Sequence, residues 1–276
     1  MLFNPFPSLL RLLFALLILG LLAGYGWHLA GQEVPMNLLA RQQAPSAAHW
    51  FGTDQMGRDL WLRAFQGTLT SLELGISTAL CSGLLAMLAA SLSLLHPRLD
   101  AAVRLVIDAM LALPHMLLLI LICFTLGGGL RGVILAVALT HWPKLALILR
   151  AEARRIACSD YVVLARCQGM GPLRRWCTHL LPGLLPQWFI GTLLMFPHAV
   201  LHSAALSFLG FGLAAHEASL GLLLADALRY LTSGGWWLAL FPGLMLLVLV
   251  LLFDQATRAL QALWFGGEGA GVSRRC

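Results

Sequence analysis

The sequence predicts an all-α integral membrane protein built as a single bundle of about six transmembrane helices. Hydrophobic residues make up 59% of the 276 residues and charged residues only 11%, whereas a soluble domain carries roughly 25% charged residues. The apolar residues also form long runs, and a helix needs about 20 of them to cross a bilayer. These runs do not alternate polar and apolar positions, which disfavours a transmembrane β-barrel.

Six apolar runs are long enough to span a membrane. The first run also fits a signal peptide, but further spans follow it, and we favour an uncleaved first span. Four runs contain a proline, which predicts a kink because proline removes a backbone hydrogen-bond donor. The runs cover roughly 8–30, 69–95, 101–126, 132–150, 185–209 and 236–256, and the prolines are Pro114, Pro143, Pro197 and Pro242.

The predicted spans divide the chain into three parts. Residues 1–68 hold the first span and an outer loop with an interfacial helix, residues 69–262 form a five-helix core, and residues 263–276 form a short tail. Spans and arginines together place both termini in the cytoplasm, because positive residues gather on that side. The net charge of +6 is then a signal of topology in a chain surrounded by membrane lipid, and it implies no nucleic-acid partner. The cytoplasmic arginines are Arg11, Arg98, Arg104, Arg150, Arg154, Arg155, Arg166, Arg174, Arg175, Arg258, Arg274 and Arg275, against Arg41, Arg58, Arg63, Arg131 and Arg229 outside.

The outer loop before the second span carries helix-start signals. Thr53 or Asp54 is suited to cap an interfacial helix that leads into this span. Asp59 and Arg63 have the i,i+4 spacing of an ion pair on such a helix.

The loop 159–183 is the longest polar and basic segment between the spans. Ser159 is a predicted N-cap for a short helix that ends at Gly169, and Gly171 followed by Pro172 predicts the start of a second helix. We therefore expect two short helices with a bend at Gly169. A merely solvated basic loop is the alternative. The residues that would form an apolar face for a partner protein are Tyr161, Val162, Leu173 and Trp176.

Ionisable residues inside the spans are candidates for a translocation pathway, because a charge facing lipid is expensive. Asp108 either pairs with Arg104, one turn away, or contacts cargo. His198 and His202 are four residues apart, so they share a helical face and both imidazoles could bind one metal ion. A hydrogen-bonding role in helix packing is the alternative for this pair.

Three motifs resemble the permease subunits of bacterial ABC importers, in the family that carries dipeptides, oligopeptides and nickel. The first is Ala165, Gly169, Leu181 and Pro182, which match the spacing of the family's coupling loop although its Glu-Ala-Ala triplet is incomplete here. Another motif is the run Ser207 to Gly212 in the fifth span. The longest motif lies in the outer loop and comprises His49-Trp50, Gly52-Thr53-Asp54, Gly57-Arg58-Asp59, Arg63, Gly67 and Ser71-Leu72.

Details of these motifs are similar to the nickel branch of the family. That branch has a His-x-x-x-His pair where peptide permeases tend to carry Glu, and this chain has His198 and His202. The Glu-Ala-Ala triplet is incomplete in that branch, as it is here at Val163 and Leu164. The fourth span of that branch carries Ser-His-Trp, which Thr140-His141-Trp142 of this chain resembles. The resemblance therefore favours nickel or a nickel chelate as cargo, with dipeptides or oligopeptides as the alternative.

The resemblance implies a non-catalytic subunit of the bacterial inner membrane. It would pair with a second homologous permease, dock two ATPase subunits through the loop 159–183, and receive cargo from an extracytoplasmic binding protein. ATP and Mg would be used by the ATPase subunits, with no cofactor in this chain, which lacks a Gly-x-x-x-x-Gly-Lys-Ser/Thr phosphate loop. A scaffolding membrane protein is one rival class. The other is an intramembrane enzyme built on His115, His141, His198 and His202.

Overall fold

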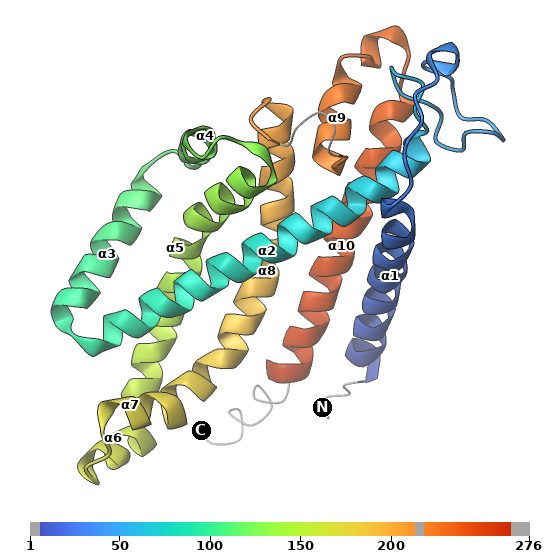
Figure 1. The fold of residues 1–276 in the computed structure, drawn as a ribbon. Coiled ribbons are helices and arrows are strands. Elements are labelled where there is room, and N and C mark those ends of the chain that lie inside the picture. The colour runs from blue at the N-terminus through green and yellow to red at the C-terminus, as the bar shows by residue number, and fades with distance from the viewer. Residues whose placement is uncertain (1–5, 213–217, 266–276) are drawn as a thin grey trace.

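The computed structural model describes residues 6–212 and 218–265, and the all-α class predicted from the sequence is confirmed (Figure 1). In this part of the chain five helices are long and apolar enough to cross a membrane, or six if α3 and α4 form one bent span. The long helices and this bent pair are α1 (Phe6–Ala30), α2 (Leu60–Leu95), α3 (Pro97–Ala112), α4 (His115–Thr125), α5 (Gly129–Ala157), α8 (Leu181–Phe208) and α10 (Trp237–Phe265). The short elements are η1 (Leu38–Ala40), α6 (Asp160–Cys167), α7 (Pro172–Arg175), η2 (Trp176–Leu180), α9 (Leu220–Leu228) and η3 (Leu231–Ser233).

Helix α2 is the longest element and crosses the bundle as a diagonal (Figure 1). Its 36 residues reach about 54 Å at 1.5 Å per residue, well beyond a hydrocarbon core of about 30 Å, and tilting is one way to accommodate that excess. The helix predicted to lead into the second span is continuous with that span, because the segment before residue 69 forms the first turns of α2. The predicted caps are wrong: Asp59 is the N-cap, and its carboxylate accepts from the Trp61 N–H at 2.8 Å.

The third predicted span is broken. Helices α3 and α4 meet at an angle of 101° instead of forming one run over 101–126. Leu113 is extended, with ψ of 144°, the conformation favoured for a residue before proline, and Pro114 has no N–H with which to continue α3. As a consequence, His115 is the first residue of α4.

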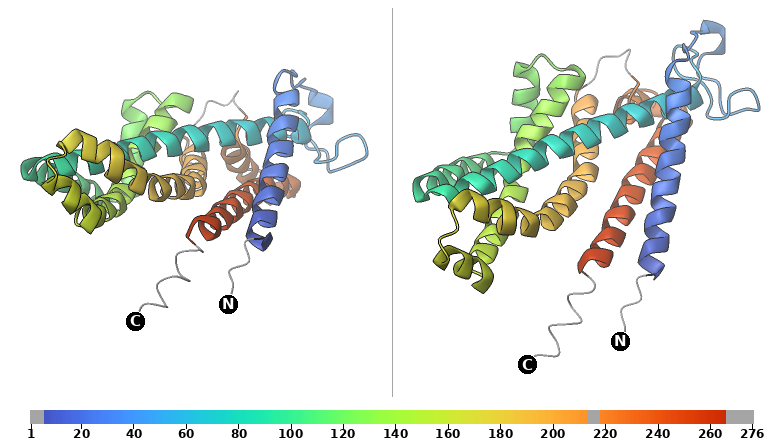
Figure 2. Two further views of the ribbon diagram at one scale, coloured as in Figure 1. Left: turned by 90° about the horizontal axis from the view of Figure 1, so that it is seen from below. Right: turned by 60° about the horizontal axis from the view of Figure 1, so that its bottom comes forward.

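Helix α2 packs against α5 and α8, and α1 packs against α10 on one side of the bundle (Figure 2). Glycines allow the closest approach of α2 to α8. A Cβ atom on Gly75 would lie 2.4 Å from the Phe196 ring, and one on Gly83 would lie 2.3 Å from the Thr192 hydroxyl. Small residues that let helix backbones approach are typical of packing inside a membrane.

The elements separate into two ends of the bundle (Figure 1). The start of α1 and the end of α10 lie at the same end as α6 and α7, whereas α9 and the loop before α2 lie at the other. Helix α10 continues to Phe265, so the first residues of the predicted tail 263–276 are helical. Residues 266–276 of that tail lie outside the described residues.

Candidate functional site

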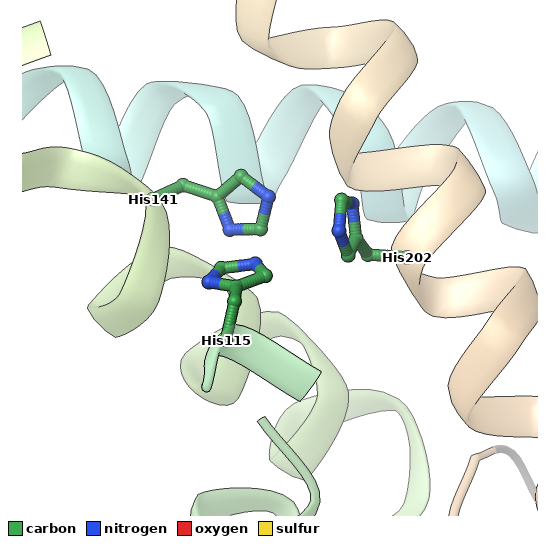
Figure 3. A group of neighbouring side chains, drawn as sticks. All are labelled: His115, His141 and His202. Carbon is green, nitrogen blue, oxygen red and sulfur yellow. The ribbon is translucent and has the colours of Figure 1, made fainter. Parts of the chain in front are cut away.

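Three imidazoles from three separate helices meet in one cluster (Figure 3). His115 comes from the first turn of α4, His141 from α5 and His202 from α8. Their ring centroids are 4.8 to 4.9 Å apart. One nitrogen from each ring lies within 4.8 Å of the others, a spacing that could hold one metal ion.

Backbone carbonyls orient two of these rings. The Nδ1 atom of His141 is 2.8 Å from the Val137 carbonyl oxygen, and that of His202 is 2.7 Å from the His198 carbonyl oxygen. Because a carbonyl only accepts, each Nδ1 donates, and in a neutral imidazole this leaves the Nε2 lone pair for another partner. Metal-binding histidines are commonly fixed in this way, with one nitrogen donating to the protein and the other left for the metal.

The cluster lines a pocket of about 360 Å³, which we call the histidine pocket. Thr140 and Lys144 from α5 and Met195 from α8 are part of its wall. Among the described residues, no carboxylate lines it. The full lining is His115, Thr140, His141, Lys144, Leu145, Ile148, Gly191, Leu194, Met195, His198 and His202.

The structure separates the two histidines that the sequence pattern grouped. Both line the histidine pocket, but only His202 belongs to the three-imidazole cluster. The Nδ1 atom of His198 donates to the Leu194 carbonyl oxygen at 3.1 Å, one turn away from the cluster. The partners of His202 are His115 and His141, and no spacing along the sequence could have revealed them, because the three residues lie on different helices.

Asp108 lies outside both the histidine pocket and the three-imidazole cluster. Helix α3 buries Ile107 and leaves both Asp108 and Arg104 exposed. The predicted Asp108–Arg104 ion pair is wrong for the described residues. The carboxylate of α3 that forms ion pairs is Asp100, which joins Arg150 and Arg154 of α5.

The loop 159–183 folds as the predicted pair of short helices, which we call the α6–α7 hairpin. Ser159 is the N-cap of α6, Gly169 has φ of +81°, and Gly171 and Pro172 begin α7. A left-handed φ is easily adopted only by glycine, which explains why the turn falls at Gly169. A π-helical turn, η2, then joins α7 to α8, where Leu181 and Pro182 are the first two residues.

The hairpin presents only part of the predicted apolar face: Tyr161 and Leu173 are exposed, whereas Val162 is buried and Trp176 is half-buried. Val162 and Ala165 are buried, and Val162 packs with Ile156 and Leu180 in a core cluster of the chain itself. The prediction that Val162 faces a partner is therefore wrong. The exposed apolar side chains are Tyr161, Val163, Leu164 and Leu173.

An ionic cluster around Asp54 fixes the loop at the opposite end of the bundle. Asp54 is 2% exposed, and its carboxylate accepts from Arg58 Nε at 2.7 Å and from Arg63 Nη1 at 2.8 Å. The carboxylate also accepts the backbone N–H groups of Met56 and Arg58. The predicted Asp59–Arg63 pair is wrong. The Asp59 carboxylate caps α2 instead, and its Oδ2 atom lies 3.0 Å from His49 Nδ1.

The chain forms a multi-span helical bundle with a histidine-lined pocket between its helices and an exposed helical hairpin at one end, the architecture of a membrane transport subunit. The chain belongs to the family of binding-protein-dependent transport system inner membrane components, whose sequence pattern matches residues 82–264. It is a permease subunit of an ABC importer, a multi-pass protein of the inner membrane and a non-catalytic one, since ATP is hydrolysed by separate subunits in this family.

Relatives include both peptide and nickel permeases. A putative peptide transport system permease of Brucella suis is 36% identical over 80% of this chain and 75% of its own length. The dipeptide permease DppC of Bacillus subtilis is 32% identical over 90% of this chain and 78% of its own. The nickel permease NikC of Escherichia coli is also 32% identical, over 90% of this chain and 91% of its own. These similarities leave the cargo undecided between a peptide and nickel.

Solved structures show the same fold. A chain of the methionine ABC transporter MetNI, in an inward-facing conformation, matches with a TM-score of 0.60 and 19% identity, over 74% of this chain and 96% of that one. A chain of an amino acid ABC transporter matches with a TM-score of 0.56 and 18% identity, over 71% and 91%.

Proposed function

We propose that this permease moves nickel, or a chelate of nickel or a similar metal, across the inner membrane by alternating access. The cluster of His115, His141 and His202 is the observation that carries this proposal. Imidazole suits nickel and its neighbours in the first transition series. Ionisable side chains inside transmembrane segments rarely face lipid, and they commonly mark the pathway of a substrate or ion.

Three imidazole nitrogens suit a metal ion that binds transiently during transport. Three nitrogens leave coordination positions open on an octahedral metal, so water or a chelator can stay bound while the ion crosses. His198, one turn from His202 in the same pocket, is placed to receive the ion at a second position. Asp108 does not line this pocket, so any part that it has in translocation would involve another surface.

The α6–α7 hairpin is the proposed contact with the ATPase. Its exposed apolar residues Tyr161, Leu164 and Leu173 offer a surface to a partner, while Val162 anchors it to the cluster that joins the ends of α5 and α8. Docking would therefore move the pocket helices directly. We propose the usual family assembly, with two ATPase subunits, a second homologous permease and an extracytoplasmic binding protein. Both chain termini would then lie on the cytoplasmic side with the hairpin.

Replacing Gly169 tests the hairpin. We expect Gly169→Val to abolish uptake and weaken co-purification of the ATPase, because a β-branched residue strongly disfavours a φ of +81°. Gly169→Asn is the matched control, since asparagine tolerates this conformation and an added Cβ meets no atom within 4 Å. Normal ATPase binding and uptake by the valine variant would exclude the hairpin as the coupling element.

Uptake in cells that lack this chain tests the cargo. Radioactive nickel and a radiolabelled dipeptide are supplied separately, with and without the restored gene. We expect the restored chain to increase nickel uptake alone. Restored dipeptide uptake without nickel uptake would establish the peptide alternative, and the histidines would then be packing groups.

A further inference from the structure

The histidine pocket holds a positive charge that three metal-binding imidazoles do not require. Lys144 lies on α5 three residues after His141, so the two side chains share a face of that helix. Both line the pocket. Because α5 is one of the membrane-crossing helices, an ammonium near its middle is costly unless it has a function or a partner.

Lys144 has no anionic partner in the described part of the chain. The ion pairs there involve other side chains, and the residues that line the histidine pocket include no carboxylate. The other polar groups of the wall are imidazoles and the Thr140 hydroxyl. Lys144 is exposed, so its ammonium is accessible, and an anionic cargo would supply the partner that the described part of the chain does not.

The positive charge of Lys144 also argues against a hydrated metal cation as cargo. A dication bound by neutral imidazoles would keep its full charge beside the Lys144 ammonium, and like charges repel strongly where water is scarce. The pocket volume of about 360 Å³ corresponds to roughly twelve water molecules at about 30 Å³ each. This volume leaves space for a metal together with a small chelator.

We infer that Lys144 selects the cargo by binding a carboxylate of the chelator, so that the pocket takes a metal chelate with at least one carboxylate. This inference rests on the proposed metal transport. The three imidazoles would occupy one set of coordination positions, and a tridentate chelator the other three. A carboxylate that binds a metal through one oxygen keeps its second oxygen free to accept from an ammonium.

Two chelators of equal denticity separate charge from coordination. Iminodiacetate binds nickel through one amine and two carboxylates, and diethylenetriamine binds it through three amines. Binding of each radioactive nickel complex to the purified permease–ATPase complex is measured by equilibrium dialysis, which removes the binding protein from the comparison. The variants are Lys144→Met, Lys144→Arg and the control Arg131→Met, which removes a positive charge from the same helix outside the pocket.

We expect the wild type to prefer nickel–iminodiacetate, and Lys144→Met to bind it at least about tenfold more weakly, the scale of a lost charge-assisted hydrogen bond. Lys144→Arg and Arg131→Met should bind it like the wild type. Equal binding of nickel–iminodiacetate by the wild type and Lys144→Met would overturn the role of Lys144 and leave metal transport intact. Failure of the wild type to bind either nickel complex would overturn the proposed function itself. A metal-free dipeptide that binds in a Lys144-dependent way would do the same.

Discussion

Replacing His115, His141 or His202 by alanine is expected to reduce nickel uptake by at least about tenfold, since even an outer-shell partner of a metal site is worth 10- to 100-fold in affinity. Each variant removes one of three nitrogens that lie within 4.8 Å of one another, and the two remaining nitrogens cannot surround the ion in the same way. Uptake of radioactive nickel by whole cells measures the loss.

His198→Ala is the informative control for this experiment. His198 is on the same helix and in the same pocket as His202, but it is outside the cluster, so we expect it to lower uptake less than His202→Ala does. All variants should co-purify with the ATPase at wild-type levels. A larger loss of nickel uptake in His198→Ala than in His115→Ala and His141→Ala would contradict the three-helix site. It would favour His198 and His202 as the metal-binding pair instead.

Replacing Asp54 by alanine is expected to destabilise the protein by about 3 to 5 kcal/mol, the range found when one partner of a buried ion pair is removed. Arg63 is 3% exposed and Arg58 is 9% exposed, and both would lose the carboxylate that neutralises them. Two backbone N–H groups that donate to Asp54 would also lose their acceptor. The fraction of purified complex that stays monodisperse after heating measures the effect.

Asp254→Ala provides the matched comparison. Asp254 pairs with Arg258 at 2.7 Å, but these side chains are 34% and 74% exposed, and an exposed ion pair contributes no more than about 1 kcal/mol. We expect Asp254→Ala to tolerate heating like the wild type. Equal heat tolerance of Asp54→Ala and Asp254→Ala would show that the Asp54 cluster does not stabilise the outer loop.

Much of the fold follows from local properties of the sequence. The apolar runs locate the long helices because burial in lipid requires about 20 consecutive apolar residues, whatever the neighbouring helices are. Ser159, Gly169, Gly171 and Pro172 locate the α6–α7 hairpin because caps and left-handed turns depend on the conformational preferences of single residues. The i,i+4 spacing of Asp254 and Arg258 on α10 likewise brings these two side chains together, because residues four apart are neighbours on a helix surface.

The sequence alone could not decide interactions for which several local partners compete. Asp59 could pair with Arg63 or cap α2, and Arg63 could pair with Asp59 or Asp54. The fold brings Asp54 into a buried position between both arginines and leaves Asp59 at the helix start. Pro114 likewise predicts a kink, but only the packing of α3 and α4 against other helices sets its angle of 101°.

The candidate site was decided by tertiary structure. The sequence determined a multi-span permease with a helical hairpin and drew attention to His202, because spans, turns and helical faces are properties of neighbouring residues. Only the fold determined that His202 meets His115 and His141, and that Lys144 lines the same pocket. These side chains come from three helices, and contacts between distant segments depend on how the helices tilt, break and pack, which no spacing along the chain encodes.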